Sequence, residues 1–216
     1  MIAQLTSLGG SCTLLDSPGA CDNAVDWTAM SQIYRAIDDQ LREFIEAQRL
    51  FFVATAPLGR DGHVNVSPKG LDTLRILGPT TVAYIDYVGS GIETVAHVRE
   101  NGRIVIMLCA FDGPPKILRL HGRGAVIESH EPQFEAMLAR FEPVAHVRAI
   151  VQVEVARISD SCGYGVPLYE FAGQRTQLPA WAEKKGEPGL QAYQRDKNTA
   201  SIDGLPALRW TREANG

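Results

Sequence analysis

The stretch Tyr84–Leu108, YIDYVGSGIETVAHVRENGRIVIML, contains the pattern that decides the fold. Its first part predicts a strand, its middle a short helix and its end a second strand. The triplet Gly89-Ser90-Gly91 lies between the first strand and the helix. A small, glycine-flanked helix entrance leaves room for a ligand, so this junction is the first candidate site.

The same patterns extend outward along the chain. Apolar residues share one helical face from about Ser31, which predicts an amphipathic helix there, and PQFEAMLARF and Leu178–Asn198 are predicted to be helical. Further strands are predicted at LFFVATA (50–56), HVNVSPKG (63–70), LDTLRILG (71–78), TVAYIDY (81–87), GRIVIMLCAF (102–111), KILRLHGRGAVIE (116–128) and HVRAIVQVEVARI (146–158). Strands outnumber helices and many are joined by tight turns, which favours an antiparallel barrel over a doubly wound parallel sheet. The fold class is therefore mainly β with peripheral helices.

Length and composition limit the function classes. The 216 residues suit one domain with appendages, and the formal net charge of −4 does not favour a nucleic acid or an anionic membrane as partner. No apolar run approaches the roughly 20 residues of a membrane-spanning helix. The cysteines form no C-x-x-C pair or zinc-like spacing, although Cys12 and Cys21 could close a disulfide loop. We expect a reduced, cytoplasmic protein.

Composition also divides the chain. Residues 1–29 are rich in Gly, Pro and small residues and show no sustained period, which predicts a poorly ordered extension. One hypothesis is that translation begins naturally at Met30. We expect the barrel domain to cover residues 30–177 and a helical tail, residues 178–216, to pack on it.

The glycine-flanked helix entrance could accept an anion. A helix N-terminus offers unpaired N–H groups and a partial positive charge, which suit a phosphate. Ser90 can contribute its hydroxyl or cap the helix with Glu93 at capping-box spacing, and Thr94 follows one turn later. The motif alone favours a plain helix start at least as much as a ligand site.

A second polar stretch is Asn65-Val66-Ser67-Pro68-Lys69. On a strand, Asn65, Ser67 and Lys69 share one face, so a hydroxyl and a cation would be presented together. Pro68 suits a strand that stops pairing. An exposed edge strand with polar residues in water explains the pattern equally well.

The third stretch is the loop SCGYGVP, residues 161–167. Tyr164 could stack on a planar ligand or simply pack, and no histidine-carboxylate arrangement accompanies Cys162. The five histidines lack metal spacing, and the sequence contains no nucleophile elbow, P-loop or dinucleotide-binding fingerprint. Hydrolase, P-loop and Rossmann functions are therefore unsupported.

Taken in order, these pieces resemble the pyridoxamine 5′-phosphate oxidase-like family of FMN-binding split barrels. The resemblance covers about Tyr34–Leu208 and rests on FFVATA, HVNVSPKG, AYIDYVGSG, HVRENGRIVIMLCAF and ILRLHGRG. SCGYGVP and KNTASIDGLP resemble the tail of one bacterial branch of that family.

The resemblance implies a homodimer that grips FMN at its interface, with an unknown small-molecule substrate. It places the cofactor against two strand ends, a partner strand around Arg119 and the loop of Tyr164. The implied cofactor-binding residues are Asn65, Val66, Ser67, Lys69, Asp86, Tyr87, Ser90, Gly91, Thr94, Arg119 and Tyr164.

The chain departs from the true oxidases after the loop serine. They carry basic residues there, whereas Gly91-Ile92-Glu93 follows Ser90, so Glu93 would need to turn away from a phosphate. The oxidases' C-terminal arginine and histidine pattern is also missing, so pyridoxamine phosphate oxidation is not the leading expectation. We expect an FMN-dependent oxidoreductase; the alternatives are a non-catalytic flavin-binding, storage or sensing protein and a deazaflavin-dependent reductase.

Overall fold

The computed structural model describes residues 31–213. The expectations for residues 1–29, including the pairing of Cys12 with Cys21 and the start at Met30, lie outside this range.

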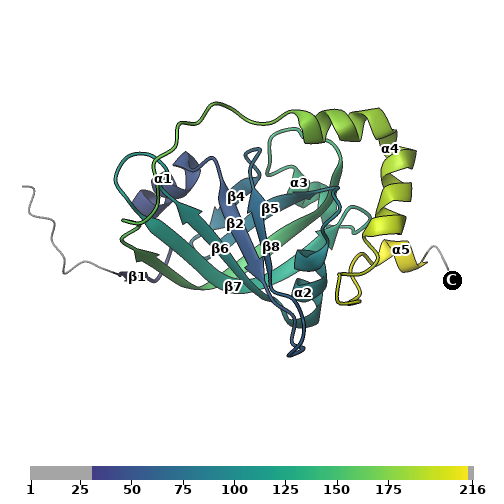
Figure 1. Ribbon diagram of the computed structural model, residues 1–216, viewed down its shortest axis with the longest axis horizontal. Helices are drawn as coiled ribbons and strands as arrows, with labels where there is room; N and C mark the ends of the chain where they lie inside the picture. Colours follow the sequence, from purple (N-terminus) through teal and green to yellow (C-terminus); the bar gives the residue numbers. More distant parts are fainter. Residues whose placement is uncertain (1–30, 214–216) are drawn as a thin grey trace, which may run out of the picture.

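One antiparallel sheet forms the body of the molecule (Figure 1). Within the described residues it has eight strands, and seven of them follow the order β3-β2-β6-β7-β8-β5-β4, while β1 pairs with β8. The strands are β1 (Ile33–Tyr34), β2 (Phe51–Thr55), β3 (Asn65–Lys69), β4 (Leu74–Gly78), β5 (Thr81–Tyr87), β6 (Arg103–Cys109), β7 (Ile117–Glu128) and β8 (Val147–Ser161). The predicted mainly β class is confirmed, and the sheet curls into a split barrel.

The split lies between the two edge strands, β3 and β4. They are consecutive in the chain and joined by residues 70–73, yet they do not pair with each other. Leu71 and Asp72 in this connection adopt left-handed φ angles of 59° and 52°. Pro68 lies in the edge strand β3, which pairs only with β2. An edge strand tolerates proline because its unpaired side has no neighbouring strand that needs the missing N–H.

Alternation along the strands directs apolar side chains into the barrel. In β2, Phe51 and Val53 are buried while Phe52 and Ala54 are half-buried on the other face. The core also takes buried residues from β5, β6, β7 and β8 and from the first helix, among them Leu41, Ile45, Val82, Tyr84, Ile106, Leu118, Leu120, Val151 and Ile158. Burial of each large apolar side chain contributes roughly 1.5–3 kcal/mol to folding.

The first helix, α1 (Asp39–Ala47), begins later than predicted. Asp38 is its N-cap, and the carboxylate accepts the Leu41 N–H at 2.9 Å. The predicted helix start near Ser31 is wrong because Ile33–Tyr34 pairs with Ile158 and Ser159 of β8.

The helix α2 (Glu93–Asn101) packs against β2, β6 and β7. It ends at Gly102, whose φ of 71° is left-handed and whose N–H reaches the Val98 carbonyl. The predicted helix over 132–141 is present as the shorter α3 (Phe134–Leu138).

The C-terminal tail crosses the barrel and then descends along its side (Figure 1). Residues 162–176 run over the barrel without regular structure to α4 (Gln177–Lys197), which is kinked at Gly186. Across the kink, the rings of Trp181 and Tyr193 meet edge to face at 5.1 Å. Ala182 and Leu190 are buried against Val88, and a last short helix is α5 (Trp210–Glu213).

The long strands β7 and β8 approach each other closely at Gly122. A Cβ atom there would lie 2.3 Å from the Glu154 carbonyl oxygen, and the strand register shifts between His121 and Gly122. Only glycine therefore permits this irregularity.

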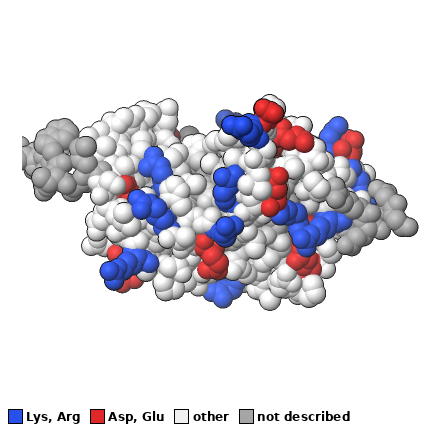
Figure 2. Space-filling model, turned by 90° about the horizontal axis from the view of Figure 1, so that it is seen from below, with Lys and Arg blue, Asp and Glu red and all other residues white. Residues whose placement is uncertain are grey.

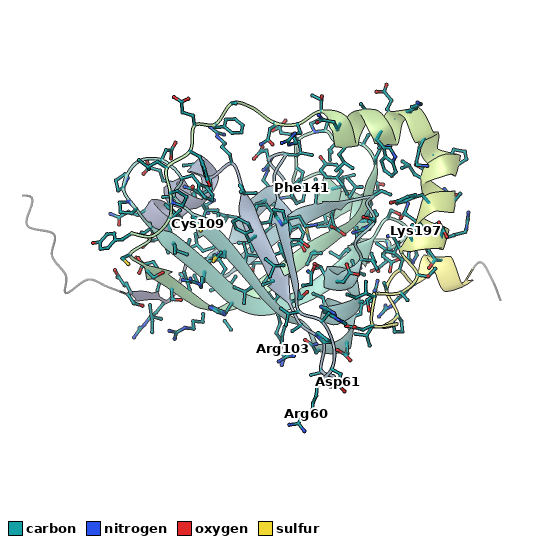
Figure 3. All side chains as sticks on the ribbon, in the orientation of Figure 1. Arg60, Asp61, Arg103, Cys109, Phe141 and Lys197 are labelled. Atoms are coloured by element: carbon teal, nitrogen blue, oxygen red, sulfur yellow. The ribbon has the colours of Figure 1, made fainter. Side chains whose placement is uncertain are left out.

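The surface is mixed in charge on the face seen in Figure 2, where basic and acidic side chains are interspersed. Arg60 and Asp61 lie at the tip of the turn between β2 and β3, far from the barrel interior, while Cys109 lies within the sheet (Figure 3). No helix in residues 31–213 combines the length and apolar character needed to cross a membrane.

Candidate functional site

A pocket of about 270 Å³ opens at the split of the barrel. It lies between the end of β3, the end of β5, the glycine loop and the start of α2, and the tail contributes Leu178 to its lining. Its lining residues are Ser67, Pro68, Lys69, Gly70, Leu71, Thr73, Ile85, Asp86, Tyr87, Val88, Gly89, Gly91, Glu93, Thr94, Arg148 and Leu178. We call it the split pocket.

A buried ion triad forms the floor of the split pocket. The Asp86 side chain is 1% exposed, and its two oxygens accept hydrogen bonds from Lys69 Nζ and Arg148 Nε, both at 2.8 Å. Lys69 comes from the edge strand β3, whereas Asp86 and Arg148 come from the neighbouring strands β5 and β8. The triad therefore bridges the split with side chains where no backbone ladder exists.

The charges in this triad stabilise one another. Burial alone would raise the pKa of Asp86, but Arg148 and Lys69 outweigh it through charge and hydrogen bonds and lower the pKa to about 2. Tyr84, fully buried nearby, has a pKa raised well above its usual value, first by burial and then by the Asp86 charge. The carboxylate is thus ionised and the phenol neutral at neutral pH.

Arg148 also holds the glycine loop. Its Nη1 donates to the Gly89 carbonyl at 2.9 Å and to Asn198 Oδ1 at 3.0 Å, and its Nη2 donates to the Gly91 carbonyl at 2.6 Å. Asn198, fully buried, in turn donates through Nδ2 to the Gly89 carbonyl at 2.9 Å. The loop therefore depends on a residue from the end of α4 as well as on β8.

A second polar network borders the pocket on the β3 side. Asn65 Nδ2 donates to Thr94 Oγ1 at 2.9 Å and to Thr55 Oγ1 at 3.3 Å, while Ser67 Oγ donates to Asn65 Oδ1 at 3.2 Å. Because Asn65, Ser67 and Lys69 lie on the same inward face of β3, the predicted alternation is confirmed. The network fixes the side chains of Ser67 and Thr94 at the pocket wall.

His97 ends this network in the interior. Its Nδ1 lies 3.0 Å from Thr55 Oγ1, and its buried Nε2 has no hydrogen-bond partner among the described residues. Burial lowers the pKa of His97, against the opposing effect of nearby carboxylates. A neutral imidazole is therefore favoured at this position.

The helix entrance differs from the expected arrangement. Ser90 is exposed and is not the N-cap; Ile92 holds that position. Glu93 does not turn away, because its Oε2 accepts the Ile92 N–H at 3.0 Å and its Oε1 accepts the Ile202 N–H at 3.4 Å. The chain's own carboxylate thus occupies the positive end of α2.

The structure brings together most of the predicted site residues. The split pocket is lined by Ser67, Lys69, Asp86, Tyr87, Gly91 and Thr94, and Asn65 lies directly behind it.

Four other predicted residues lie outside the pocket lining. Val66 points to the outer face of the sheet and is 61% exposed, and Ser90 is an exposed residue of the glycine loop. Arg119 bonds Ser161 on β8, and Tyr164 is 52% exposed in the loop after β8. In this single chain they do not converge with Lys69.

Two residues of the site were missed from the sequence. Arg148 precedes the apolar run 149–151 of β8 and is itself buried, and a buried charge requires a partner. Asn198 belongs to KNTASIDGLP, which was quoted only for its resemblance. Within residues 31–213, no cluster of His, Cys, Asp or Glu is arranged to hold a metal ion.

Comparisons with known proteins identify the family of the chain. The family model described as pyridoxamine 5′-phosphate oxidase matches residues 37–162. The chain is 39% identical over 198 residues to the pyridoxamine 5′-phosphate oxidase family protein ustO of Aspergillus flavus, covering 83% of this chain and 78% of that protein. Because this relative is fungal, the similarity is not confined to the bacterial branch named above.

Solved structures superpose on part of the chain. HupZ of Group A Streptococcus is 22% identical, with a TM-score of 0.44, and covers 56% of this chain and 91% of its own. An FMN-binding protein of Syntrophomonas wolfei is 16% identical, with a TM-score of 0.40, and covers 53% and 78%. At these scores we infer nothing about function from them. The family model and the fungal relative establish that the chain belongs to the pyridoxamine 5′-phosphate oxidase family.

Proposed function

We propose that this protein binds a flavin in the split pocket and acts as an oxidoreductase on a small substrate. The observation that carries the proposal is the convergence of Ser67, Lys69 and Thr94 on one pocket beside the buried Asp86–Arg148 pair. Family membership favours a flavin as the ligand. A bound flavin supplies hydride transfer at its ring, while the protein supplies orientation and electrostatics.

The wall of the pocket suits the uncharged, polar parts of a flavin. Lys69 uses one hydrogen bond on Asp86, so its ammonium retains N–H donors for a ligand, and its side chain is 21% exposed. The hydroxyls of Ser67 and Thr94 are held by Asn65 and face the same space. Ring carbonyls and ribityl hydroxyls are matched by such groups.

The terminal phosphate of FMN, the flavin expected from the sequence, is matched less well. The Arg148 guanidinium already donates hydrogen bonds to Asp86, to Asn198 and to the carbonyls of the glycine loop. Glu93 places a carboxylate where the phosphate was expected. The residues therefore fit the ring and the ribityl chain better than they fit a phosphate dianion.

The proposal includes a homodimer. On the outer face of the sheet, Val66 of β3 lies beside Ala54 of β2, which lies beside Val105 of β6. In the same register, Pro68 lies beside Phe52, which lies beside Met107. Met107 lies opposite Arg119 of β7, so a second copy on this apolar face would meet Arg119. Because Val66 is 61% exposed, such a face favours a partner.

The oligomer is tested by the sedimentation of the wild type and two variants. Val66→Asp is expected to produce monomers, whereas Ile202→Asp, at a 71% exposed apolar residue of the tail beside the start of α2, should leave the dimer intact. A wild-type monomer at micromolar concentration would contradict the dimer.

The flavin proposal is tested by the visible absorption spectrum of the purified protein and chromatography of what acid releases. We expect a flavin spectrum, and we expect Lys69→Ala to retain less flavin than the exposed-lysine control Lys184→Ala. A colourless protein that also fails to bind added riboflavin, FMN and FAD would refute flavin binding.

A second candidate is a flavin-binding protein without a dedicated substrate. Leu178, at the start of α4, lines both the split pocket and a neighbouring apolar pocket, so the tail covers part of the entrance. Rapid reoxidation of the reduced flavin by one specific acceptor would favour the enzyme. Slow and indiscriminate reoxidation would favour the binding protein.

A further inference from the structure

Four charged side chains line the split pocket, and their charges cancel. Lys69 and Arg148 are cationic, and Asp86 and Glu93 are anionic. Both cations are already paired with Asp86 at 2.8 Å, so Glu93 is the member without a cationic partner among the pocket residues. An incoming dianion would meet a neutral pocket that has a carboxylate on its wall.

Glu93 is also held in place by the backbone. Its two oxygens accept the N–H groups of Ile92 and Ile202, which come from the helix entrance and from the tail. Gly91 leaves room for the Glu93 carboxylate in this position, because a Cβ atom at residue 91 would lie only 3.2 Å from Glu93 Oε2. Displacing Glu93 would therefore break two hydrogen bonds and leave the N–H groups of Ile92 and Ile202 without this acceptor.

We propose that Glu93 determines which flavin the split pocket accepts by removing the preference for a terminal phosphate monoester. This inference rests on the proposed function, since it concerns the choice among flavins at the same site. A phosphate monoester carries about −1.5 to −2 charges at neutral pH, and a carboxylate beside it repels it. Riboflavin lacks that group and avoids the repulsion.

The test is a titration of the ligand-free protein with riboflavin and with FMN, followed by flavin fluorescence. We expect FMN to bind wild type no more tightly than riboflavin. In Glu93→Gln, which keeps an oxygen acceptor for the Ile92 N–H, the ratio of the two dissociation constants is expected to shift toward FMN by about tenfold. Glu100→Gln, the same change on α2 at a residue outside the split pocket, should leave the ratio unchanged.

Salt dependence gives a second measurement that needs no variant. Because salt screens repulsion between charges, raising it should improve FMN binding to wild type relative to riboflavin binding. An attractive phosphate site would show the opposite trend.

The outcomes separate the two proposals. Wild type that binds FMN at least tenfold more tightly than riboflavin, with no change of the ratio in Glu93→Gln, would overturn the role of Glu93 and leave flavin binding intact. Failure of riboflavin, FMN and FAD to bind wild type and variant would overturn the proposed function and this inference with it.

Discussion

Replacing Arg148 by methionine is expected to destabilise the fold far more than replacing Lys69. The Arg148 side chain is 4% exposed, so its removal leaves the buried Asp86 carboxylate with Lys69 alone and deprives the Gly89 and Gly91 carbonyls of their donor. Breaking a buried ion pair from one side costs roughly 3–5 kcal/mol. The 21% exposed Lys69 can be replaced in part by water, so Lys69→Met should cost about 1–2 kcal/mol.

Urea unfolding followed by circular dichroism measures this difference. With a slope of roughly 2–3 kcal/mol/M for a chain of this size, Arg148→Met should lower the midpoint by about 1.5 M and Lys69→Met by less than about 1 M. Arg157→Met, at an exposed arginine of the same strand, should change the free energy of unfolding by no more than about 0.5 kcal/mol.

A double-mutant cycle isolates the pair itself. Asp86→Asn, Arg148→Met and the double variant should give a coupling free energy of at least about 2 kcal/mol, because both partners are buried and in contact. Equal midpoints for Arg148→Met and Lys69→Met, or additive single effects in the cycle, would refute the reasoning that the buried Asp86–Arg148 pair stabilises the fold more than the Lys69–Asp86 contact does.

Three further predictions follow from other features. The pKa of Asp86 is about 2, against an ordinary 3.8, so its ion pairs stabilise the fold above about pH 4 and lose that contribution as the pH falls through 2. The free energy of unfolding, measured in urea between pH 2 and 5, should therefore depend less steeply on pH in Asp86→Asn than in wild type. Gly122→Ala should cost more than about 2 kcal/mol, because its Cβ would meet the Glu154 carbonyl, whereas Gly165→Ala, with open space around it, should stay within about 0.5 kcal/mol by the same assay. Asp38→Ala should cost about 1 kcal/mol through loss of the α1 cap, and unchanged thermal unfolding would contradict that role.

Much of the fold could be predicted because its signals are local. The alternation in β2, β3 and β8 and the glycine at the end of α2 are visible within short windows of sequence. The start of α1 was missed because Ile33 and Tyr34 continue the apolar pattern of the helix while pairing with β8, more than a hundred residues away. No local pattern reports such a pairing.

The site was predicted in part for the same reason. The polar face of Asn65, Ser67 and Lys69 marked the end of β3 as a candidate from local alternation, whereas Asp86 was expected only through the family resemblance. Arg148 lies at the start of β8 and Asn198 caps the end of α4. Their contacts form only when β5, β8 and the tail come together in the folded chain. Glu93 was recognised as an obstacle, but its backbone partner Ile202 could not be predicted, because the tail's path is set by tertiary packing.

The contribution of Asn198 to the support of the glycine loop has a consequence for biosynthesis. Synthesis proceeds from the N-terminus, and Lys69, Asp86 and Arg148 leave the ribosome long before the residue that completes the loop they support. A nascent chain that ends before Asn198 has the barrel strands but lacks this support for the loop. A ligand that binds only when the glycine loop is fully supported would therefore stabilise chains that include Asn198 selectively over chains truncated before it.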